Sequence, residues 1–475
     1  MAFVRLFFSI ALLSVLLLAA LGYLRLAGER TEGVFDVQPP TPYFHYAPRA
    51  APPLGRLLVV HGLGGSKEVM NMLSYALADS GYEVYSIDLP GHGDSQAGFN
   101  AMLSLNVLRA VLERLGTHTV VLGHSLGAGL LLDLANERRF DSMVLLSPPP
   151  TNIGRIDARR VLVLTGQFDL PPVRAFTRRL DGAHPVSIDL RTVRMAGHTG
   201  LILRPTTPRW IVEWLGGNPE SIYFGERYTL LICMLITAAG LGGVLLWGGK
   251  PVSAGTGGLG GPQRTTVVAY VAASVAAFLV SAVAVVFEWL RLFGTDYLIG
   301  FVFVAGLTLC VFTWAAHAPR DPRSWRGSWR PPNFAPAALA AAYVIILPVV
   351  LIGSELAHTF LSPGRLWRFP VIAAASIPLL LADEVYLRPI RPWWKAAAAA
   401  MLTRLILGGF IATGVLTANR GDSFLVLIVH LVILFWLALW LAGDLVHNRT
   451  QDRLATAAFG ALVQGWMFAS LFIAT

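Results

Sequence analysis

Charged side chains are scarce in this chain of 475 residues, since Lys, Arg, Asp and Glu together make up 14% of it. Soluble globular proteins usually carry about 25%. Hydrophobic residues reach 55%, and the mean hydropathy is +0.60. This composition excludes a soluble enzyme, a disordered chain and a coiled coil. It indicates a protein that places much of its length in a membrane.

Cysteine is almost absent as well. The two cysteines, Cys233 and Cys310, both lie in apolar runs, and the polar region over residues 25–226 has none. From this absence we expect neither a disulfide framework nor a zinc site in the polar region. We expect no cofactor and no metal.

Acidic residues are also in deficit, and the net charge is +9. Residues 25–226 hold 19 basic and 19 acidic side chains, so the whole excess lies elsewhere. It falls between apolar stretches, where loop charge sets membrane orientation. A basic chain often binds nucleic acid, but this placement of the charge predicts no nucleic-acid partner.

Long apolar runs are abundant. The first, residues 4–24, is long enough to span a bilayer, which needs about 20 residues. Small residues near its end leave a cleaved signal peptide open, but the full length favours an uncleaved anchor. After Gly225 we expect about eight further spans over residues 227–475. They are expected at 228–247, 266–289, 297–317, 335–354, 369–386, 397–417, 423–443 and 455–474.

Loop charges predict the orientation of these spans. With the N-terminus inside, the inner segments hold 12 basic residues and the short outer loops hold 4, as the positive-inside rule predicts. The inner ones are Arg5, Lys250, Arg264, Arg320, Arg323, Arg326, Arg330, Arg388, Arg391, Lys395, Arg449 and Arg453, and the outer ones are Arg291, Arg365, Arg368 and Arg420. We therefore expect a multi-pass membrane protein with a cytoplasmic N-terminus, an extracytoplasmic polar region and an extracytoplasmic C-terminus. The Gly-rich stretch 253–262 follows a span instead of a strand, so we interpret it as a flexible connector and not as a phosphate loop.

The polar region alternates short apolar runs with helical patterns. Strand-like runs occur at residues 56–61, 82–88, 119–123, 142–146, 160–165 and 187–195. Residues 67–80 have helical spacing and end at Gly81, a plausible C-terminal cap. Strands that alternate with helices predict a parallel sheet flanked by helices. An all-α transmembrane bundle follows it.

One motif in this region carries chemistry. Residues 119–127 read T-V-V-L-G-H-S-L-G, and a helical pattern follows from Ala128. Strand, G-x-S-x-G and helix in this order are typical of a nucleophile elbow, which holds a serine on a strained turn above the edge of the sheet. The following helix would aim its N-terminal amides at the reacting oxygen. We interpret Ser125 as the nucleophile.

With these motifs the polar region resembles the α/β-hydrolase superfamily, in its serine esterase/lipase branch, over residues 40–215. H-G-L-G-G at 61–65 resembles the oxyanion loop of that family, and D-L-P-G-H-G-D-S at 88–95 resembles its turn motif. L-T-G-Q-F-D at 164–169 matches the strand end that presents the acid, and A-G-H-T at 196–199 matches the loop that bears the base. The order Ser, Asp, His is the one that this fold uses.

The resemblance implies a role for each of these residues. A serine hydroxyl needs a base within hydrogen-bond reach, and His198 is our choice. An acid must orient that ring and stabilise its protonated form, and Asp169 is our choice, with Asp141 second. The backbone amides of Leu63 and Leu126 would stabilise the oxyanion. His61, His92 and His124 belong to motifs in which the family uses them structurally, and His184 lies before the last strand, on the wrong side for the active edge.

The spacing after Leu146 predicts an open pocket. About ten residues separate that strand from the next, too few for a helical cap domain. We therefore expect a membrane-anchored serine hydrolase that cleaves an ester of a lipid or lipid-linked substrate from the bilayer through an acyl-enzyme intermediate. The overall plan resembles eukaryotic inositol deacylases of glycolipid anchors. Two alternatives stay open: an acyltransferase with the same triad, and a transporter or scaffold whose hydrolase domain only binds a ligand.

Ionisable residues inside the apolar runs are the last feature. Charges in lipid are expensive and usually paired or functional. Asp383 and Glu384 are expected to pair with Arg404, as structural ion pairs in preference to a proton or headgroup site. Glu288, Glu355, His358 and His430 are expected towards the outer face, as candidates for a lipid-headgroup site.

Overall fold

The computed structural model describes residues 2–49, 52–116, 118–151, 156–180, 187–246, 263–284, 286–317, 334–351, 353, 355–418 and 423–475. The expected connector at 253–262, His184, Lys250, Arg420 and the four arginines at 320–330 lie outside these residues. The chain forms two compact units. We call Leu13–Ala238, Val349–Phe360 and Ile473–Thr475 the sheet unit, and Met1–Leu12, Ala239–Pro348 and Leu361–Phe472 the helical unit.

The sheet unit contains one sheet of eight strands in the order β1-β2-β4-β3-β5-β6-β7-β8. The strands are β1 Arg30–Phe35, β2 Thr41–Tyr46, β3 Gly55–Val60, β4 Tyr82–Ile87, β5 Val120–His124, β6 Phe140–Leu146, β7 Ala158–Gly166 and β8 Ser187–Val193. All neighbours from β4 to β8 pair in parallel, and β2 pairs antiparallel with β1 and β4. The six strands expected from the sequence are confirmed, and β1 and β2 extend the sheet at one edge.

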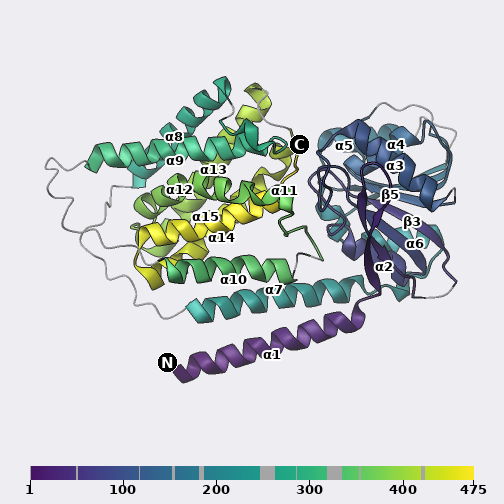
Figure 1. Ribbon diagram of the computed structural model, residues 1–475, viewed down its shortest axis with the longest axis horizontal. Coiled ribbons are helices and arrows are strands. Elements are labelled where there is room, and N and C mark those ends of the chain that lie inside the picture. Colours follow the sequence, from purple (N-terminus) through teal and green to yellow (C-terminus); the bar gives the residue numbers. More distant parts are fainter. Residues whose placement is uncertain are drawn as a thin grey trace. The chain divides into compact units, whose positions relative to one another are not determined.

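Helices cover both faces of this sheet (Figure 1). They are α2 Asn71–Asp79, α3 Ala101–Leu115, α4 Leu126–Leu134, α5 Pro171–Leu180 and α6 Thr206–Leu215. Alternate residues of β3 point to opposite faces: Leu58 packs in one core with α3, α4 and α5, and Leu57 packs in the other with α2 and α6. Burial on both faces explains why the central strands are continuous apolar runs.

The helix expected over residues 67–80 is shorter in the structure, since α2 begins at Asn71. Residues 67–70 form a turn instead. The backbone N–H of Lys67 donates to the Asp88 carboxylate at 2.8 Å, which ties this segment to the end of β4. That tertiary bond replaces the first helical turn.

The sheet unit also includes parts of two long helices, α1 Ala2–Leu26 and α7 Phe224–Leu246. It contains α1 from Leu13 onward and α7 up to Ala238. Within this unit Tyr23 of α1 packs against Leu231 of α7. The guanidinium of Arg227 is fully buried, pairs with Asp79 at 2.6 Å and donates to the Leu26 carbonyl at 3.0 Å. One buried arginine therefore ties α7 both to the last turn of α1 and to the end of α2.

The helical unit is built from α8 Gln263–Val283, α9 Thr295–His317, α10 Ala335–Leu351, α11 Pro363–Leu366, α12 Arg368–Tyr386, α13 Trp393–Ala418, α14 Ser423–Thr450 and α15 Arg453–Leu471. Helix α12 packs against α9 and α15. A Cβ added at Gly306 of α9 would lie 2.3 Å from the backbone of Leu379, and one at Gly465 of α15 would lie 3.0 Å from the backbone of Ala373. Glycine at both points lets the helix backbones approach closely, as is common between membrane helices.

Eight helices in the described part of the chain are long and apolar enough to cross a membrane, which is compatible with a multi-pass membrane protein. They are Val4–Leu26, Pro219–Val244, Thr265–Val283, Thr295–Ala315, Pro363–Tyr386, Trp393–Thr417, Phe424–Thr450 and Arg453–Leu471. The expected span at 335–354 corresponds to α10, an apolar helix of 17 residues.

Candidate active site

Ser125 lies on the turn between β5 and α4, as the motif predicts. Its backbone has φ 50° and ψ −115°, a conformation that side-chain-bearing residues rarely adopt. A Cβ at Gly123 would lie 2.6 Å from the backbone of Ala128, and one at Gly127 would lie 2.5 Å from the Val60 carbonyl oxygen. Glycines are therefore required on both sides of the serine, because the turn packs directly against neighbouring backbone.

The three side chains expected to act together lie within hydrogen-bond distance of one another. His198 Nε2 is 2.8 Å from Ser125 Oγ, and His198 Nδ1 is 2.7 Å from Asp169 Oδ1. Asp169 and His198 are buried, while Ser125 is partly exposed. The imidazole thus bridges a hydroxyl and a carboxylate that are 44 positions apart in the chain.

Asp169 is held by several donors besides His198. The backbone N–H of Leu170 donates to Oδ1 at 2.8 Å, and the hydroxyl of Ser147 donates to Oδ2. Burial acts to raise the pKa of the Asp169 carboxyl, but the hydrogen bonds from His198, Ser147 and Leu170 outweigh it and lower that pKa below its usual value. The carboxylate is therefore ionised at neutral pH.

Asp141, the second choice for the acid, lies elsewhere. Its Oδ2 pairs with Nδ1 of the exposed His118 at 3.0 Å. Because Asp141 is at the start of β6, it lies at the opposite end of the sheet from the residues that follow the strands.

Ser147 was not singled out from the sequence. It follows β6, is fully buried and has a positive φ of 48°. Leu146 and Leu164 are register partners in the parallel pair β6 and β7, so the residues that follow both strands meet at one edge. This neighbour relation is the signal that could have placed Ser147 beside Asp169, since both follow those strands.

The loop expected to supply an oxyanion donor lies directly beside the elbow. A Cβ at Gly62 would be 3.0 Å from Ser125 Cβ and 2.8 Å from His124 Nδ1. Leu63 follows Gly62 on this loop, and Leu126 is the first residue of α4. The structure therefore brings the segments of both expected oxyanion residues to the serine.

The motif histidines are buried. Nε2 of His61 accepts a hydrogen bond from the Leu89 N–H at 3.0 Å, and Nε2 of His124 lies 3.1 Å from the His198 carbonyl oxygen. Burial, followed by the nearby His198, lowers the pKa of His124 to about 4. His124 is thus a neutral donor that holds the loop carrying His198, and His92 packs against the His61 ring.

A family model described as alpha/beta hydrolase fold matches residues 55–179. The match covers β3 to α5, including the elbow and Asp169. The sheet unit has the α/β-hydrolase fold. No curated protein matches the chain in a sequence search.

Solved structures of hydrolases resemble the same part of the chain. XC6422 from Xanthomonas campestris, described as a member of a/b serine hydrolase without lid, is 21% identical, has a TM-score of 0.36, and covers 40% of this chain and 97% of its own. Carboxylesterase CesB from Bacillus subtilis is 16% identical with a TM-score of 0.34 and coverages of 43% and 100%. Monoacylglycerol lipase from Paleococcus ferrophilus is 19% identical with a TM-score of 0.32 and coverages of 38% and 98%.

This α/β-hydrolase fold has no cap domain in its described residues. β6 ends at Leu146 and β7 begins at Ala158, and the described residues between them, 147–151 and 156–157, form no helix. This agrees with the spacing in the sequence.

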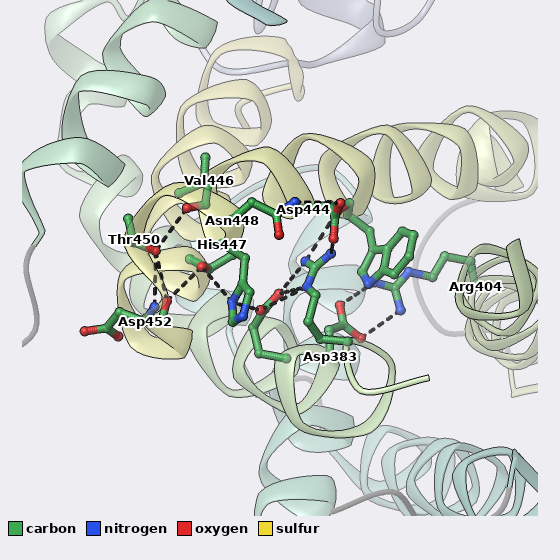
Figure 2. A network of polar contacts seen from close by, with 12 residues as sticks. Asp383, Arg404, Asp444, Val446, His447, Asn448, Thr450 and Asp452 are labelled. Atoms are coloured by element: carbon green, nitrogen blue, oxygen red, sulfur yellow. Dashed lines mark hydrogen bonds and ion pairs between the residues drawn. The ribbon is translucent and has the colours of Figure 1, made fainter. Parts of the chain in front are cut away.

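The helical unit holds a second polar network, shown in Figure 2. Arg404 pairs with Asp383, which also accepts a hydrogen bond from Tyr270. Glu384 does not pair with Arg404, contrary to expectation: it pairs with Arg388, one helical turn away, at 2.5 Å, and with His447 at 2.9 Å. Arg388 also pairs with Asp444 at 3.0 Å, so each of these buried charges lies in an ion pair.

Two of the four residues expected near the outer face also have different neighbours. Glu355 and His358 belong to the segment Val349–Phe360 of the sheet unit. Glu355 pairs with Arg30 at 3.1 Å, and His358 lies against Glu68 and Asp94. Their side chains therefore contact residues of the α/β-hydrolase fold within the sheet unit.

Proposed function

We propose that this protein is a membrane-anchored serine hydrolase that cleaves an ester bond of a lipid or lipid-linked substrate. The observation that supports this most is the pair of contacts from one imidazole, 2.8 Å to Ser125 Oγ and 2.7 Å to Asp169 Oδ1. A nucleophile, a base and an orienting acid in this arrangement are what acyl transfer through serine requires.

The chemistry follows from the positions of these atoms. His198 Nε2 takes the hydroxyl proton as Ser125 Oγ attacks the ester carbonyl carbon. The carbonyl oxygen becomes an oxyanion, which the N–H groups of Leu63 and Leu126 would stabilise by about 3 kcal/mol per donor. The C–O bond to the alcohol then breaks, and His198 gives its proton to the departing oxygen. Water repeats the sequence to release the acid and restore Ser125.

Exposed apolar side chains on the loops of the acid and base support a lipid substrate. Phe168 and Leu170 flank Asp169 and are 62% and 41% exposed, and Met195, three residues before His198, is 63% exposed. The Phe168 N–H donates to the Ala196 carbonyl at 2.8 Å, so the two loops are adjacent. An apolar rim around the triad suits an acyl chain better than a polar substrate.

The orientation expected from the loop charges remains part of the proposal. Starting at the sheet unit, α7, α8, α9 and α10 lead to the segment Val349–Phe360, and α12 to α15 lead on to Ile473–Thr475. Both segments contact the sheet unit: His358 lies 3.5 Å from Glu68, and the Phe99 N–H donates to the Ala474 carbonyl at 2.9 Å. The chain can return to the same side of the membrane only after an even number of crossings, so α10 must be a span if α7, α8 and α9 are. Together with α1 this supports nine spans, with the hydrolase domain and the C-terminus on the same side. Labelling of an introduced Glu220→Cys by a membrane-impermeant reagent on intact cells tests this.

A fluorophosphonate probe tests the hydrolase itself. It forms a covalent bond only with a serine activated as a nucleophile, so the full-length protein in detergent should label and Ser125→Ala should not. Ser221→Ala removes a hydroxyl that donates to the Asn218 carbonyl of its own turn, and it should label like wild type. Equal labelling of the Ser125→Ala variant would refute the proposal.

Labelling also separates the alternatives. A scaffold that only binds a ligand through this fold would not react with the probe. An acyltransferase would react, but its acyl-enzyme would turn over faster when an acceptor alcohol is added than in water alone. For a hydrolase, lipid profiling of a deletion strain should show an accumulated ester.

A further inference from the structure

A second cluster of ligating side chains lies in the sheet unit, outside the triad. Glu68 follows β3, Asp94 follows β4, and His358 comes from Val349–Phe360; each offers one ligand atom, and these atoms lie within 4.8 Å of one another. We propose that Glu68, Asp94 and His358 bind a divalent transition-metal ion of the Zn²⁺ or Mn²⁺ type. This site is independent of the proposed hydrolase activity.

His358 gives the first independent reason. Its side chain is 5% exposed, and neither ring nitrogen has a hydrogen-bond partner among the described residues. Nδ1 is 3.5 Å from Glu68 Oε1, and Nε2 is 3.7 Å from Asp94 Oδ1. These separations are long for hydrogen bonds. The 3.5 Å from Nδ1 to Glu68 Oε1 lies within the roughly 3.3–3.6 Å between two ligands of a tetrahedral ion with bonds of about 2.0–2.2 Å.

One ring nitrogen serves as the ligand, so the ring turns slightly to bring it between the two carboxylates. Glu68 Oε2 is buried and likewise has no hydrogen-bond partner among the described residues. A buried imidazole and a buried carboxylate oxygen that both lack partners are costly. A shared cation would satisfy both.

The charge of the cluster gives the second reason. Lys67 Nζ lies 2.7 Å from Asp88, 2.9 Å from Glu68 and 2.5 Å from Asp94. One ammonium therefore faces three carboxylates, and this leaves two negative charges in a largely buried place. We assign the charge of the Lys67 ammonium to its ion pair with Asp88, because Asp88 is fully buried and also accepts the backbone N–H of Lys67. A divalent cation would balance the charge that remains.

An ion can reach the cluster from solvent. Asp94 and Lys67 line a cavity of about 630 Å³ together with Tyr43 and Gln96. The side chain of Asp94 is 47% exposed, so it can contact an ion in the cavity before Glu68 and His358 bind it. The exposed side of Asp94 also leaves room for water ligands. One imidazole with two carboxylates favours Zn²⁺ or Mn²⁺ over Ca²⁺ and Mg²⁺, which prefer oxygen ligands alone.

The consequence would be structural. Glu68 and Asp94 lie on turns of the α/β-hydrolase fold, whereas His358 lies on a segment that the chain adds more than 250 positions later. A bound ion would fasten that segment to both turns.

Metal content and thermal unfolding of the full-length protein in detergent test the site. After treatment with EDTA, ZnCl₂ or MnCl₂ should raise the melting temperature by several degrees and bind at one ion per chain, while CaCl₂ and MgCl₂ should have little effect. His358→Gln and Asp94→Asn should each weaken binding at least about tenfold. His118→Gln removes a histidine that also faces a carboxylate, Asp141, but on the surface, and it should bind like wild type.

If His358→Gln fails to fold, Asp94→Asn still tests the site. The side chain of Asp94 is half exposed, so we expect this variant to fold. Two results would overturn the proposal. The first is no metal bound and no shift of the melting temperature in wild type, which would mean that the cluster holds no cation besides the ammonium of Lys67. The second is unchanged binding in Asp94→Asn, which would place the ion elsewhere.

Discussion

The sheet unit and the helical unit both bury charged side chains, but they use them differently. In the sheet unit the carboxylate of Asp169 holds an imidazole whose other nitrogen faces the partly exposed Ser125. In the helical unit Asp383 and Glu384 face arginines, and Arg388 pairs in addition with Asp444 at 3.0 Å. The first arrangement leaves a partly exposed hydroxyl at its end, whereas the second joins charged groups of opposite sign to one another.

This difference indicates which buried charges are expected to affect turnover and which are expected to affect stability. An ion pair between helices costs desolvation but becomes hard to separate once both partners are present. A triad needs its last member to stay accessible, so it forms at the edge of a sheet where loops meet. We therefore expect substitutions of the triad and its hydrogen-bond partners to change turnover, and substitutions of the ion pairs in the helical unit to change stability.

The largest effect should come from Asp169→Asn. An amide cannot hold His198 in the required tautomer or stabilise its protonated form, so turnover should fall by about 10⁴-fold with little change in stability. Asp141→Asn breaks a comparable carboxylate–histidine contact on the surface and should leave turnover unchanged. Hydrolysis of a soluble ester by both variants measures the difference, and equal rates would remove Asp169 from the site.

Arg404→Gln should have the next largest effect, on stability alone. It leaves the buried carboxylate of Asp383 without its cation, which costs about 3–5 kcal/mol. The double variant Asp383→Asn with Arg404→Gln should recover most of this loss, because no charge is then left unpaired. Arg391→Gln, at an exposed arginine, is the control.

Thermal unfolding in detergent measures the stability of these variants, and fluorophosphonate labelling below the transition measures the active site. We expect labelling of Arg404→Gln at the wild-type rate. If Arg404→Gln kept the wild-type melting temperature but was no longer labelled, the separation of roles between the two units would be wrong.

A smaller effect concerns the pH dependence of stability. His124 has a folded-state pKa of about 4, against 6.5 for the unfolded residue. Between these values the unfolded chain binds a proton that the folded chain does not, so stability is complete above pH 6.5 and falls as the pH drops towards 4. The amplitude is on the order of 3 kcal/mol. His124→Gln should be less stable at pH 7 but lose less stability on acidification, and identical slopes would contradict this.

The sequence predicted the parts of the fold whose signals are local. The strands β3 and β5 to β7 are apolar runs because both of their faces are covered. The strands β1 and β2 were missed: β1 alternates weakly in burial, and β2 carries Pro42, a residue that does not indicate a strand. Their place in the sheet depends on the pairing of β2 with β4 and of β1 with β2, which no local pattern encodes.

The same distinction holds for the sites. Ser125, Asp169 and His198 were predicted because each lies in a motif at the end of a strand. The contact of Glu384 with Arg388 could have been found from helical spacing, but that with His447 depends on how α12 and α14 pack. The position of His358 beside Glu68 could not be found, since it depends on a long-range return of the chain to the sheet unit.

The smallest effect should come from Ser147→Ala, and it tests whether a partner of the acid matters to turnover. The hydroxyl of Ser147 donates to Asp169 Oδ2, whose other donors, Thr165 and the Gly166 N–H, are at 3.3 and 3.4 Å. A hydrogen bond to a charged group contributes about 1.5–3 kcal/mol. Only part of it acts on the transition state, so kcat should fall roughly tenfold with KM unchanged.

Ser142→Ala is the matched control for this variant, because Ser142 is also buried on β6 but accepts its hydrogen bond from Arg160 at 3.0 Å. It should lower the melting temperature and leave kcat as it is. If Ser147→Ala behaves like Ser142→Ala, the hydroxyl only stabilises the fold. If kcat falls and the melting temperature does not change, Ser147 positions Asp169. The residues that affect turnover would then include one that lies outside the sequence motifs.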